Sequence, residues 1–208
     1  MTKPLVISAP QPRTLDLIFT PEALGRLRAT YRVAEMHQDS VASQEPATLA
    51  QVRYILGQPP LSTEAIAAMT GLRAILNVES NLLANMPYEP LFERGVHVLT
   101  TGRAFAEPVA EIGLGFALCL ARGIVDADLG FRLGREQWGG EGNAGARLIS
   151  GSEVGLIGFG DLGRALARLL RGFDARTRAY DPWLPPSMLR EAGMEPADLG
   201  TILEESDF

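Results

Sequence analysis

The sequence predicts an α/β fold with parallel sheets, and three observations along the chain lead to this prediction. Short apolar runs alternate with helical segments over roughly the first hundred residues, as they do when crossover helices join parallel strands. A long and almost wholly apolar segment follows at 106–122. A glycine-rich junction at 158–163 then separates another apolar run from an amphipathic segment, which indicates a second α/β unit.

The first α/β unit is predicted over residues 1–105. Its strands are expected at 5–7, 52–56, 73–76 and 95–99, and its helices at 21–29 and 62–69. Thr20 is placed to cap the first of these helices, with Pro21 in the first turn, where a backbone N–H is not needed. Ser62 marks the beginning of the second helix in the same way.

Residues 106–150 are predicted to connect two domains. The helix at 106–122 has apolar side chains around its whole circumference, so we expect it to be buried between the domains. Residues 132–150 are polar and glycine-rich, so we expect a crossing loop and place the domain boundary in this region. Glu107 and Glu111 share one face of the helix, where they either complement the helix dipole or lie near a cofactor.

The second α/β unit is predicted over residues 151–208. Its elements are expected as a buried strand from 153, a helix at 161–171, a strand at 176–180 and a short helix at 187–192. Residues 206–208 look like the first residues of a third strand. A doubly wound sheet needs several strands covered on both faces, and two strands with a beginning would leave open edges. We therefore expect a fragment that is unstable or prone to aggregation when made alone, with a naturally short variant as the alternative.

Composition excludes several classes of protein. The chain has 208 residues, 46% of them hydrophobic, and a net charge of −6, so neither disorder nor a nucleic acid or membrane partner is expected. The single cysteine, Cys119, excludes an intramolecular disulfide and is expected in a core, which favours the cytoplasm. The beginning of the chain lacks a signal-peptide pattern, and the longest uncharged apolar stretch, 112–121, is too short to span a bilayer. We expect no metal site, and we expect His37 to be solvated and His97 to pack or lie at the surface.

The pattern Gly-x-Gly-x-x-Gly occurs twice, and only one copy has the context that dinucleotide binding requires. The copy at 140–145 follows a polar segment and precedes a stretch too short for a helix, so we interpret it as a loop. The copy at 158–163 lies directly between a strand and a helix.

Each residue of this second copy has a physical role in the predicted site. Gly158 permits a tight turn, Gly160 lets a pyrophosphate approach the backbone, and Gly163 lets the helix pack close to the strand. The free N–H groups at the helix start and the helix dipole would hold the pyrophosphate. The predicted cofactor-binding residues are Gly158, Phe159, Gly160, Asp161, Leu162 and Gly163.

Asp181 is the seventh predicted cofactor-binding residue, 18 positions beyond Gly163 at the end of the next strand. Its carboxylate can accept hydrogen bonds from the adenosine ribose and would repel a 2′-phosphate, which favours NAD over NADP. We expect no arginine where a 2′-phosphate would be clamped, and expect Arg176 and Arg178 on a solvated or packing face. S-adenosylmethionine is the strongest rival ligand for this junction.

Several segments together resemble the NAD-dependent D-isomer-specific 2-hydroxyacid dehydrogenases. The resemblance lies in residues 93–96, 106–111, Trp138, 154–167 and 180–182. It implies a flavodoxin-like substrate domain, followed by the first part of a Rossmann NAD-binding domain. It also implies an oxidoreductase acting on the CH–OH group of a small 2-hydroxy acid, and a homodimer when full length.

The chain departs from the family pattern in two places. The family has a glycine-rich loop that binds the substrate carboxylate, whereas this chain has Asn77, Val78, Glu79 and Ser80, our substrate-binding candidates. Glu79 would repel a carboxylate if it faced the site, so the loop binds a different substrate, the register has shifted, or the loop is a plain surface loop. The family's catalytic arginine, glutamate and histidine would come after Phe208, so no catalytic residue is predicted here and the chain alone is expected to be inactive.

Two other functions stay open at this point. The same fold, by resemblance, serves as an NADH-sensing scaffold in transcriptional corepressors of the C-terminal-binding protein type. An oxidoreductase with a different substrate is the third possibility, and the altered loop at residues 77–80 keeps both open.

Overall fold

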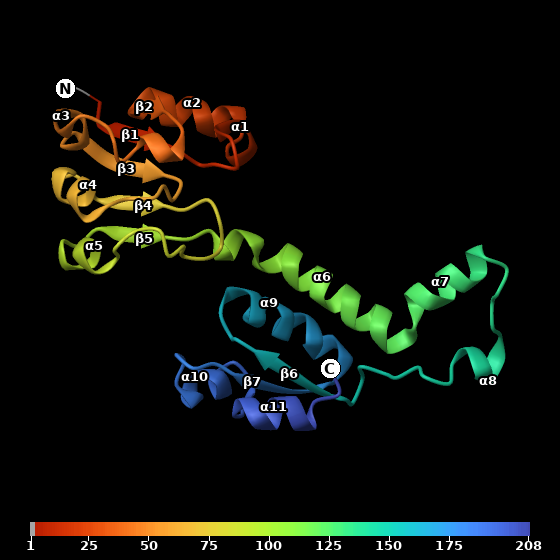
Figure 1. Ribbon diagram of the computed structural model, residues 1–208. Helices are drawn as coiled ribbons and strands as arrows, with labels where there is room; N and C mark the ends of the chain where they lie inside the picture. The colour runs from red at the N-terminus through yellow and green to blue at the C-terminus, as the bar shows by residue number, and fades with distance from the viewer. Residues whose placement is uncertain (1–2) are drawn as a thin grey trace. The chain divides into compact units, whose positions relative to one another are not determined.

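The computed structural model describes residues 3–208, which form two compact units. The first unit ends at Gly102, and the second comprises Arg103–Phe208. Each unit has its own parallel sheet, as the ribbon in Figure 1 shows, and its own cluster of buried hydrophobic residues. The parallel α/β architecture predicted from the sequence is confirmed.

The first unit is built on a five-stranded parallel sheet with the strand order β2-β1-β3-β4-β5. The strands are β1 (Leu5–Ser8), β2 (Arg32–Glu35), β3 (Val52–Leu56), β4 (Ala74–Leu76) and β5 (His97–Leu99). The helices are α1 (Leu15–Ile18), α2 (Pro21–Thr30), α3 (Pro46–Leu49), α4 (Thr63–Ala68) and α5 (Glu89–Glu93), with a 3-10 turn at Gln38–Ser40. The sequence analysis missed β2, whose four residues are all partly or fully exposed and show no apolar run.

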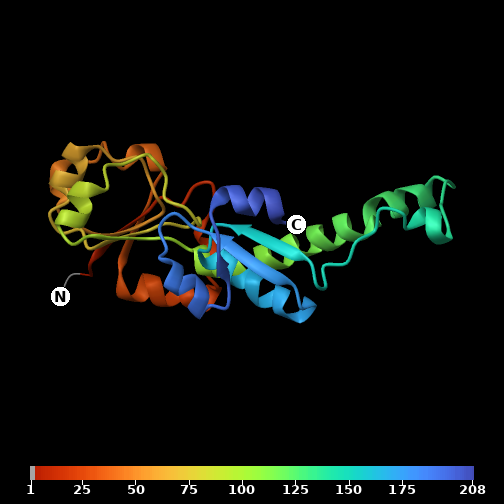
Figure 2. The ribbon, with the colours of Figure 1, turned by 90° about the horizontal axis from the view of Figure 1, so that it is seen from below.

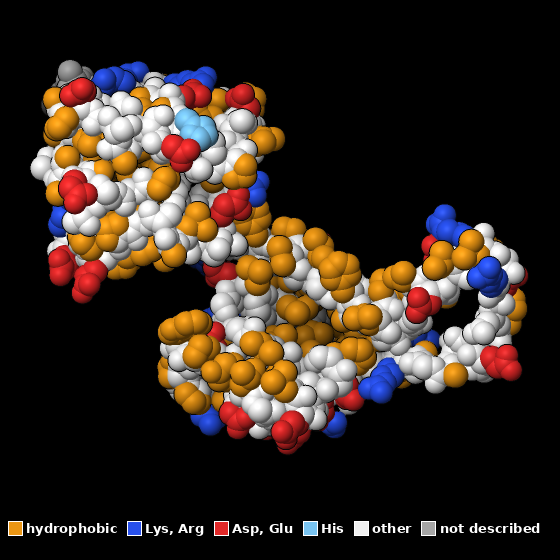
Figure 3. Space-filling model, viewed as in Figure 1, with side chains coloured by type: hydrophobic (Ala, Val, Ile, Leu, Met, Phe, Trp, Pro, Cys, Tyr) orange, Lys and Arg blue, Asp and Glu red, His pale blue; other side chains and the backbone are white. Residues whose placement is uncertain are grey.

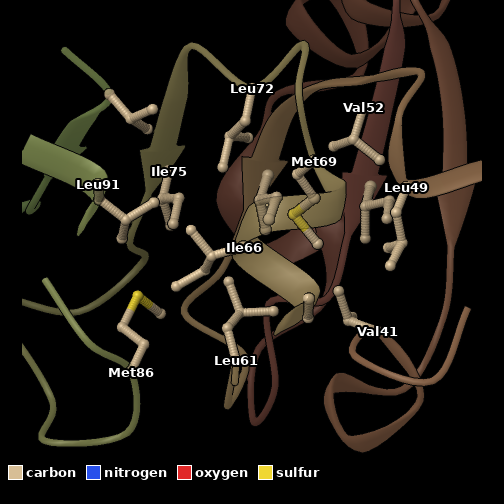
Figure 4. Packing of buried hydrophobic residues seen from close by; sticks show 14 of the residues in the cluster. Val41, Leu49, Val52, Leu61, Ile66, Met69, Leu72, Ile75, Met86 and Leu91 are labelled. Carbon is tan, nitrogen blue, oxygen red and sulfur yellow. The ribbon is translucent and has the colours of Figure 1, made fainter. Parts of the chain in front are cut away.

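Both faces of this sheet are covered, as a parallel sheet requires. Figure 2 shows α2 on one side of the sheet and α3, α4 and α5 on the other. The larger core lies under α3, α4 and α5, where Ile66 and Met69 pack against Ile75 and Leu91 (Figure 4). A smaller cluster around Val6 and residues of α1 and α2 fills the opposite face. Because all five strands run parallel, their carboxyl ends lie at one edge of the sheet, where ligands of open α/β sheets bind.

The long helix α6 (Gly102–Arg122) is buried on one face only. Ala106, Ala110 and Ala121 pack into the cores of the second unit. The opposite face is exposed, so the prediction of burial on all sides is wrong for this chain; the exposed fractions are Val109 41%, Ile112 55%, Phe116 66% and Leu120 78%. By length and composition α6 could cross a membrane, but core helices pass the same test.

The crossing segment after α6 has more structure than the sequence indicates. It contains α7 (Ile124–Arg132) and the short α8 (Gly139–Gly142), which includes part of the 140–145 glycine pattern. The interpretation of that pattern as a loop is therefore wrong for residues 140–142, although no strand precedes the pattern among the described residues.

The second unit has a three-stranded parallel sheet with the order β6-β7-β8. Its elements are β6 (Glu153–Ile157), α9 (Asp161–Leu170), a 3-10 turn (Arg171–Phe173), β7 (Arg176–Tyr180), α10 (Pro186–Glu191), β8 (Glu195–Pro196) and α11 (Leu199–Glu205). Figure 2 shows α9 and α11 on opposite sides of β6 and β7. The two-residue β8 was not predicted.

Residues 206–208 run beside β6. The N–H of Asp207 donates to Glu153 O at 2.8 Å, and Gly155 N–H donates to Phe208 O at 2.9 Å. These bonds have the character of the expected third strand, although no strand is assigned there.

Candidate functional site

The junction between β6 and α9 has the geometry that its glycines predict. Gly158 has φ of +95°, a conformation that residues with side chains rarely adopt. A Cβ on Gly163 would lie under 3.0 Å from the carbonyl oxygen of Gly158, so only glycine allows the helix to approach the strand this closely. A Cβ on Gly160 would meet no atom within 4 Å, so its backbone faces open space. The turn is therefore tightly packed where Gly163 faces Gly158 and open where Gly160 faces solvent.

The open side leads to the first turn of α9. Gly160 is the N-cap residue, and no side chain caps the helix there. The first N–H groups of a helix have no partner within the helix, and the helix dipole gives this end a partial positive charge. A groove of about 420 Å³ runs past this turn; it is lined by Val109, Ala110, Gly113, Gly155, Leu156, Ile157, Gly158, Gly160, Asp161, Leu162, Gly163 and Leu166. Such a helix start binds anionic groups, and the phosphates of nucleotides are among them.

Asp181, directly after β7, is bound to the backbone of the glycine-rich turn. One carboxylate oxygen accepts from Phe159 N–H at 2.8 Å, and the other accepts from Trp183 N–H at 2.9 Å and Leu184 N–H at 3.1 Å. Burial raises the pKa of Asp181, but these three N–H groups and the nearby Arg164 outweigh it, so the pKa lies below its ordinary value. The carboxylate is therefore charged at neutral pH and holds two ends of parallel strands together. Sequence reasoning assigned it to the ribose and did not foresee this structural role.

Two arginines lie beside Asp181, contrary to the expectation that none would. Arg103 and Arg164 line a depression of about 470 Å³ together with Phe159, Gly160, Asp161, Asp181, Trp183 and Leu184. Arg164 donates to Phe159 O at 3.1 Å, and its guanidinium lies 5.2 Å from the centre of the Phe159 ring. Arg103 comes from the start of α6, far away in sequence, so no local pattern could have placed it here.

Other polar residues singled out in the sequence have ordinary structural partners. Glu107 forms an exposed ion pair with Arg168 of α9, and Arg178 pairs with Glu195 and Glu205. His37 accepts a hydrogen bond from Asp39 N–H at 3.4 Å in an exposed turn. Three more residues discussed in the sequence analysis are Glu111, His97 and Cys119. The side chains of Glu111 and His97 are exposed, and Cys119 is half-buried and forms no disulfide. Over residues 3–208, no three potential metal-ligating side chains come together.

The predicted substrate loop follows β4 and is shaped by Asn77. The buried Asn77 side chain donates to Asn81 O at 2.6 Å and accepts from Glu79 N–H at 3.1 Å. Glu79 O in turn accepts from Thr101 N–H at 3.1 Å, so the loop is fixed to the end of β5. The loop is therefore an ordered structure at the carboxyl edge of the first sheet.

Three buried side-chain oxygens that have no hydrogen-bond partner among residues 3–208 lie at this same edge. They are Ser8 Oγ at the end of β1, Gln58 Oε1 after β3 and Thr101 Oγ1 after β5. Buried polar atoms are normally paired, so orphaned ones indicate where water or a ligand belongs. Ligands of open parallel sheets bind outside the carboxyl ends of the strands.

Known proteins are similar to this chain in sequence. Residues 114–208 match the sequence model of the D-isomer specific 2-hydroxyacid dehydrogenase, NAD binding domain. A hydroxypyruvate reductase from Thermotoga maritima is 36% identical over 126 residues, 61% of this chain and 39% of that protein. A glyoxylate reductase from Thermococcus litoralis is 31% identical over 128 residues, 60% of this chain and 39% of that protein.

Solved structures are similar over almost the whole chain. The crystal structure of a phosphoglycerate oxidoreductase from Rhizobium etli is 64% identical with a TM-score of 0.89, covering 99% of this chain and 65% of that one. The PH0520 protein from Pyrococcus horikoshii, at 22% identity, has a TM-score of 0.77 over 99% of this chain and 61% of that one, and shows the shared fold alone. The matches cover less than half the length of the two curated relatives and about two thirds of these two structures.

Proposed function

We propose that the whole protein is an NAD-dependent oxidoreductase acting on a small 2-hydroxy acid, because residues 114–208 match the NAD-binding domain of the D-isomer specific 2-hydroxyacid dehydrogenases and the chain is similar to a phosphoglycerate oxidoreductase over almost its whole length. The observation that supports this most is the tight glycine turn from β6 into α9, open on its outer side, with Asp181 bound to its backbone. Bound NAD would supply the hydride acceptor, and its reduced form the hydride donor.

The residues of this junction fit a dinucleotide. In our proposal, the backbone of Gly158, Phe159, Gly160, Asp161, Leu162 and Gly163 holds the pyrophosphate. Asp181 uses its remaining acceptor capacity for the adenosine ribose, since a carboxylate offers about four lone-pair positions and three are taken. Its charge disfavours a 2′-phosphate, whereas Arg103 and Arg164 in the same depression favour one. We propose that the carboxylate, which accepts a hydrogen bond from the backbone of the turn, decides for NAD.

A small 2-keto or 2-hydroxy acid is the proposed substrate class. The similar proteins are named for hydroxypyruvate, glyoxylate and phosphoglycerate, which all bear a carboxylate. In the loop of Asn77, Val78, Glu79 and Ser80, the N–H groups of Val78 and Ser80 donate to no acceptor within residues 3–208, which suits them to a carboxylate. No residue of this chain is assigned as the proton donor.

Nucleotide titration of the full-length protein tests the cofactor. We expect NADH to quench protein fluorescence at lower concentrations than NADPH. In Asp181→Asn, we expect a smaller difference between the affinities for NADH and NADPH. Tighter NADPH binding by the unaltered protein would reverse the role given to Asp181. NADH oxidation with glyoxylate or hydroxypyruvate tests the reaction, and NADH binding without turnover of any 2-keto acid would favour a sensor.

We also expect a homodimer in the cytoplasm, in which a second copy covers the exposed face of α6. Figure 3 shows hydrophobic side chains along this helix and the start of α7. Val109, Ile112, Phe116 and Leu120 of this helix are exposed, and so are Val125 and Leu129 of α7. Contiguous exposed apolar surface of this kind is typical of protein interaction sites. Phe116→Glu should give a monomer by light scattering, whereas Glu111→Gln on the same helix should not. A monomeric unaltered protein would contradict this expectation.

A further inference from the structure

We propose that Arg13 determines whether the substrate loop accepts an anion, because its guanidinium neutralises Glu79. This makes Arg13 a positioning and specificity residue that acts through Glu79. The proposal rests on the proposed function only in taking residues 77–80 as the place where a substrate carboxylate binds.

The two side chains form a parallel, two-point ion pair. Arg13 Nε lies 2.8 Å from Glu79 Oε1, and a terminal nitrogen lies 3.3 Å from Glu79 Oε2. Such fork-to-fork pairs fix orientation as well as charge. The hydrogen bond and charge of Glu79 raise the pKa of Arg13, so the guanidinium is cationic at neutral pH. The pair joins residues 66 positions apart in the chain.

The pair lies among the features that mark the carboxyl edge of the first sheet. Arg13 belongs to the loop between β1 and α1, where its N–H donates to Pro10 O at 3.0 Å. It lines a small cavity of about 170 Å³ with the buried Ser8, whose hydroxyl has no partner. Glu79 is bound through its own backbone to Asn77 and Thr101, and the Thr101 hydroxyl is the second orphan at this edge. The ion pair therefore adjoins the unsatisfied polar atoms where a ligand is expected.

Charge balance is the reason that this pair matters. The family's loop has glycines where this chain has Glu79, so a carboxylate side chain stands next to the amides proposed to bind a carboxylate. Two like charges a few ångströms apart repel strongly where water is partly excluded. Glu79 has about a third of its side chain exposed, so solvent alone screens it incompletely. With Arg13 bound to Glu79, the ion pair has no net charge. The backbone N–H groups of Val78 and Ser80 then determine how the loop interacts with a substrate carboxylate.

The test measures glyoxylate binding to the full-length protein by ligand-observed NMR, with NAD present, at pH 7.5. We expect Arg13→Gln to weaken binding about tenfold through the uncovered charge of Glu79. Arg13→Lys, which keeps the charge, should lose less, and the double variant Arg13→Gln/Glu79→Gln should bind more tightly than Arg13→Gln. The matched control is Arg53→Gln on β3, whose side chain bonds to Gly71 O away from this edge and should leave binding unchanged.

The double variant separates the effect of charge from simple loss of structure, because removing the Glu79 carboxylate restores glyoxylate binding only if its uncovered charge is what weakens binding in Arg13→Gln. Equal binding by Arg13→Gln and unaltered protein, failure of the double variant to recover, or no glyoxylate binding at all would each overturn the proposal. If the binding pattern holds but NADH is not oxidised, the proposed reaction fails and the role of Arg13 stands.

Discussion

Two alanine substitutions in one turn separate the structural role of the glycines from their proposed role in binding. At Gly163, a Cβ would lie under 3.0 Å from the backbone oxygen of Gly158, so either α9 or the strand end must move. At Gly160, φ is −72° and a Cβ would meet nothing within 4 Å, so alanine fits without strain. The same chemical change therefore has opposite expected effects three residues apart.

The cost at Gly163 follows from overpacking against a backbone atom. Overpacked sites lose about 1–3 kcal/mol, and this contact belongs at the upper end because a carbonyl cannot rotate away. Better helix propensity of alanine returns up to about 1 kcal/mol. A net loss of about 2 kcal/mol corresponds to a fall in Tm of roughly 8 °C for a unit of this size.

Thermal melts followed by circular dichroism and NADH titrations by fluorescence provide the assay. Gly163→Ala should melt about 8 °C lower. Gly160→Ala should melt like the unaltered protein but bind NADH at least about tenfold more weakly, since its methyl group occupies the approach of the pyrophosphate. An unchanged Tm for Gly163→Ala would refute the packing argument, and full NADH affinity in Gly160→Ala would refute the site.

Three further predictions concern other contacts. Asp181→Asn should destabilise the second unit by about 1–3 kcal/mol in urea unfolding, because an amide cannot accept from N–H groups on both sides. The pKa of Asp181 is lower in the folded than in the unfolded protein. The carboxylate therefore adds to the free energy of unfolding above its unfolded pKa, and this contribution is lost as the pH falls through the folded pKa. The difference in free energy of unfolding between Asp181→Asn and the unaltered protein should therefore shrink below about pH 4. Gly57→Ala should unfold the first unit, because φ is +106° and a Cβ would collide with Ala9 O. Gly95→Ala, with φ of +69° and open space around the Cβ, should cost only the backbone strain. Equal Tm values for the two variants would contradict this prediction. Arg94→Ala should lower stability by about 1 kcal/mol by removing 2.6 Å bonds to the carbonyls of Ile66 and Met69, and an unchanged urea midpoint would count against it.

Local signals in the sequence were sufficient for six of the eight strands in residues 3–208 and for the helices α2, α4, α6, α9 and α10, whereas α1, α3, α5, α7, α8 and α11 were not predicted. Thr20 and Ser62 cap α2 and α4 as expected, each accepting from the N–H three residues later. β3 was predicted with its observed bounds, and the glycine turn after β6 lies at the expected strand-to-helix junction. These features depend on neighbours within about one helical turn, so the residues themselves contain the information. The short exposed strands β2 and β8 lack that signal, because their existence depends on the edges that they pair with.

The sequence by itself determined the α/β class, most of the strands and the glycine junction, since each follows from the periodicity and the backbone freedom of adjacent residues. Only the tertiary structure decided that Asp181 binds the glycine turn, that Arg103 lies beside it and that Arg13 neutralises Glu79. It also decided that one face of α6 stays exposed in this chain. The physical reason is that these contacts join residues far apart in sequence, and the winding of the parallel sheets alone determines which strand ends, and therefore which charges, become neighbours.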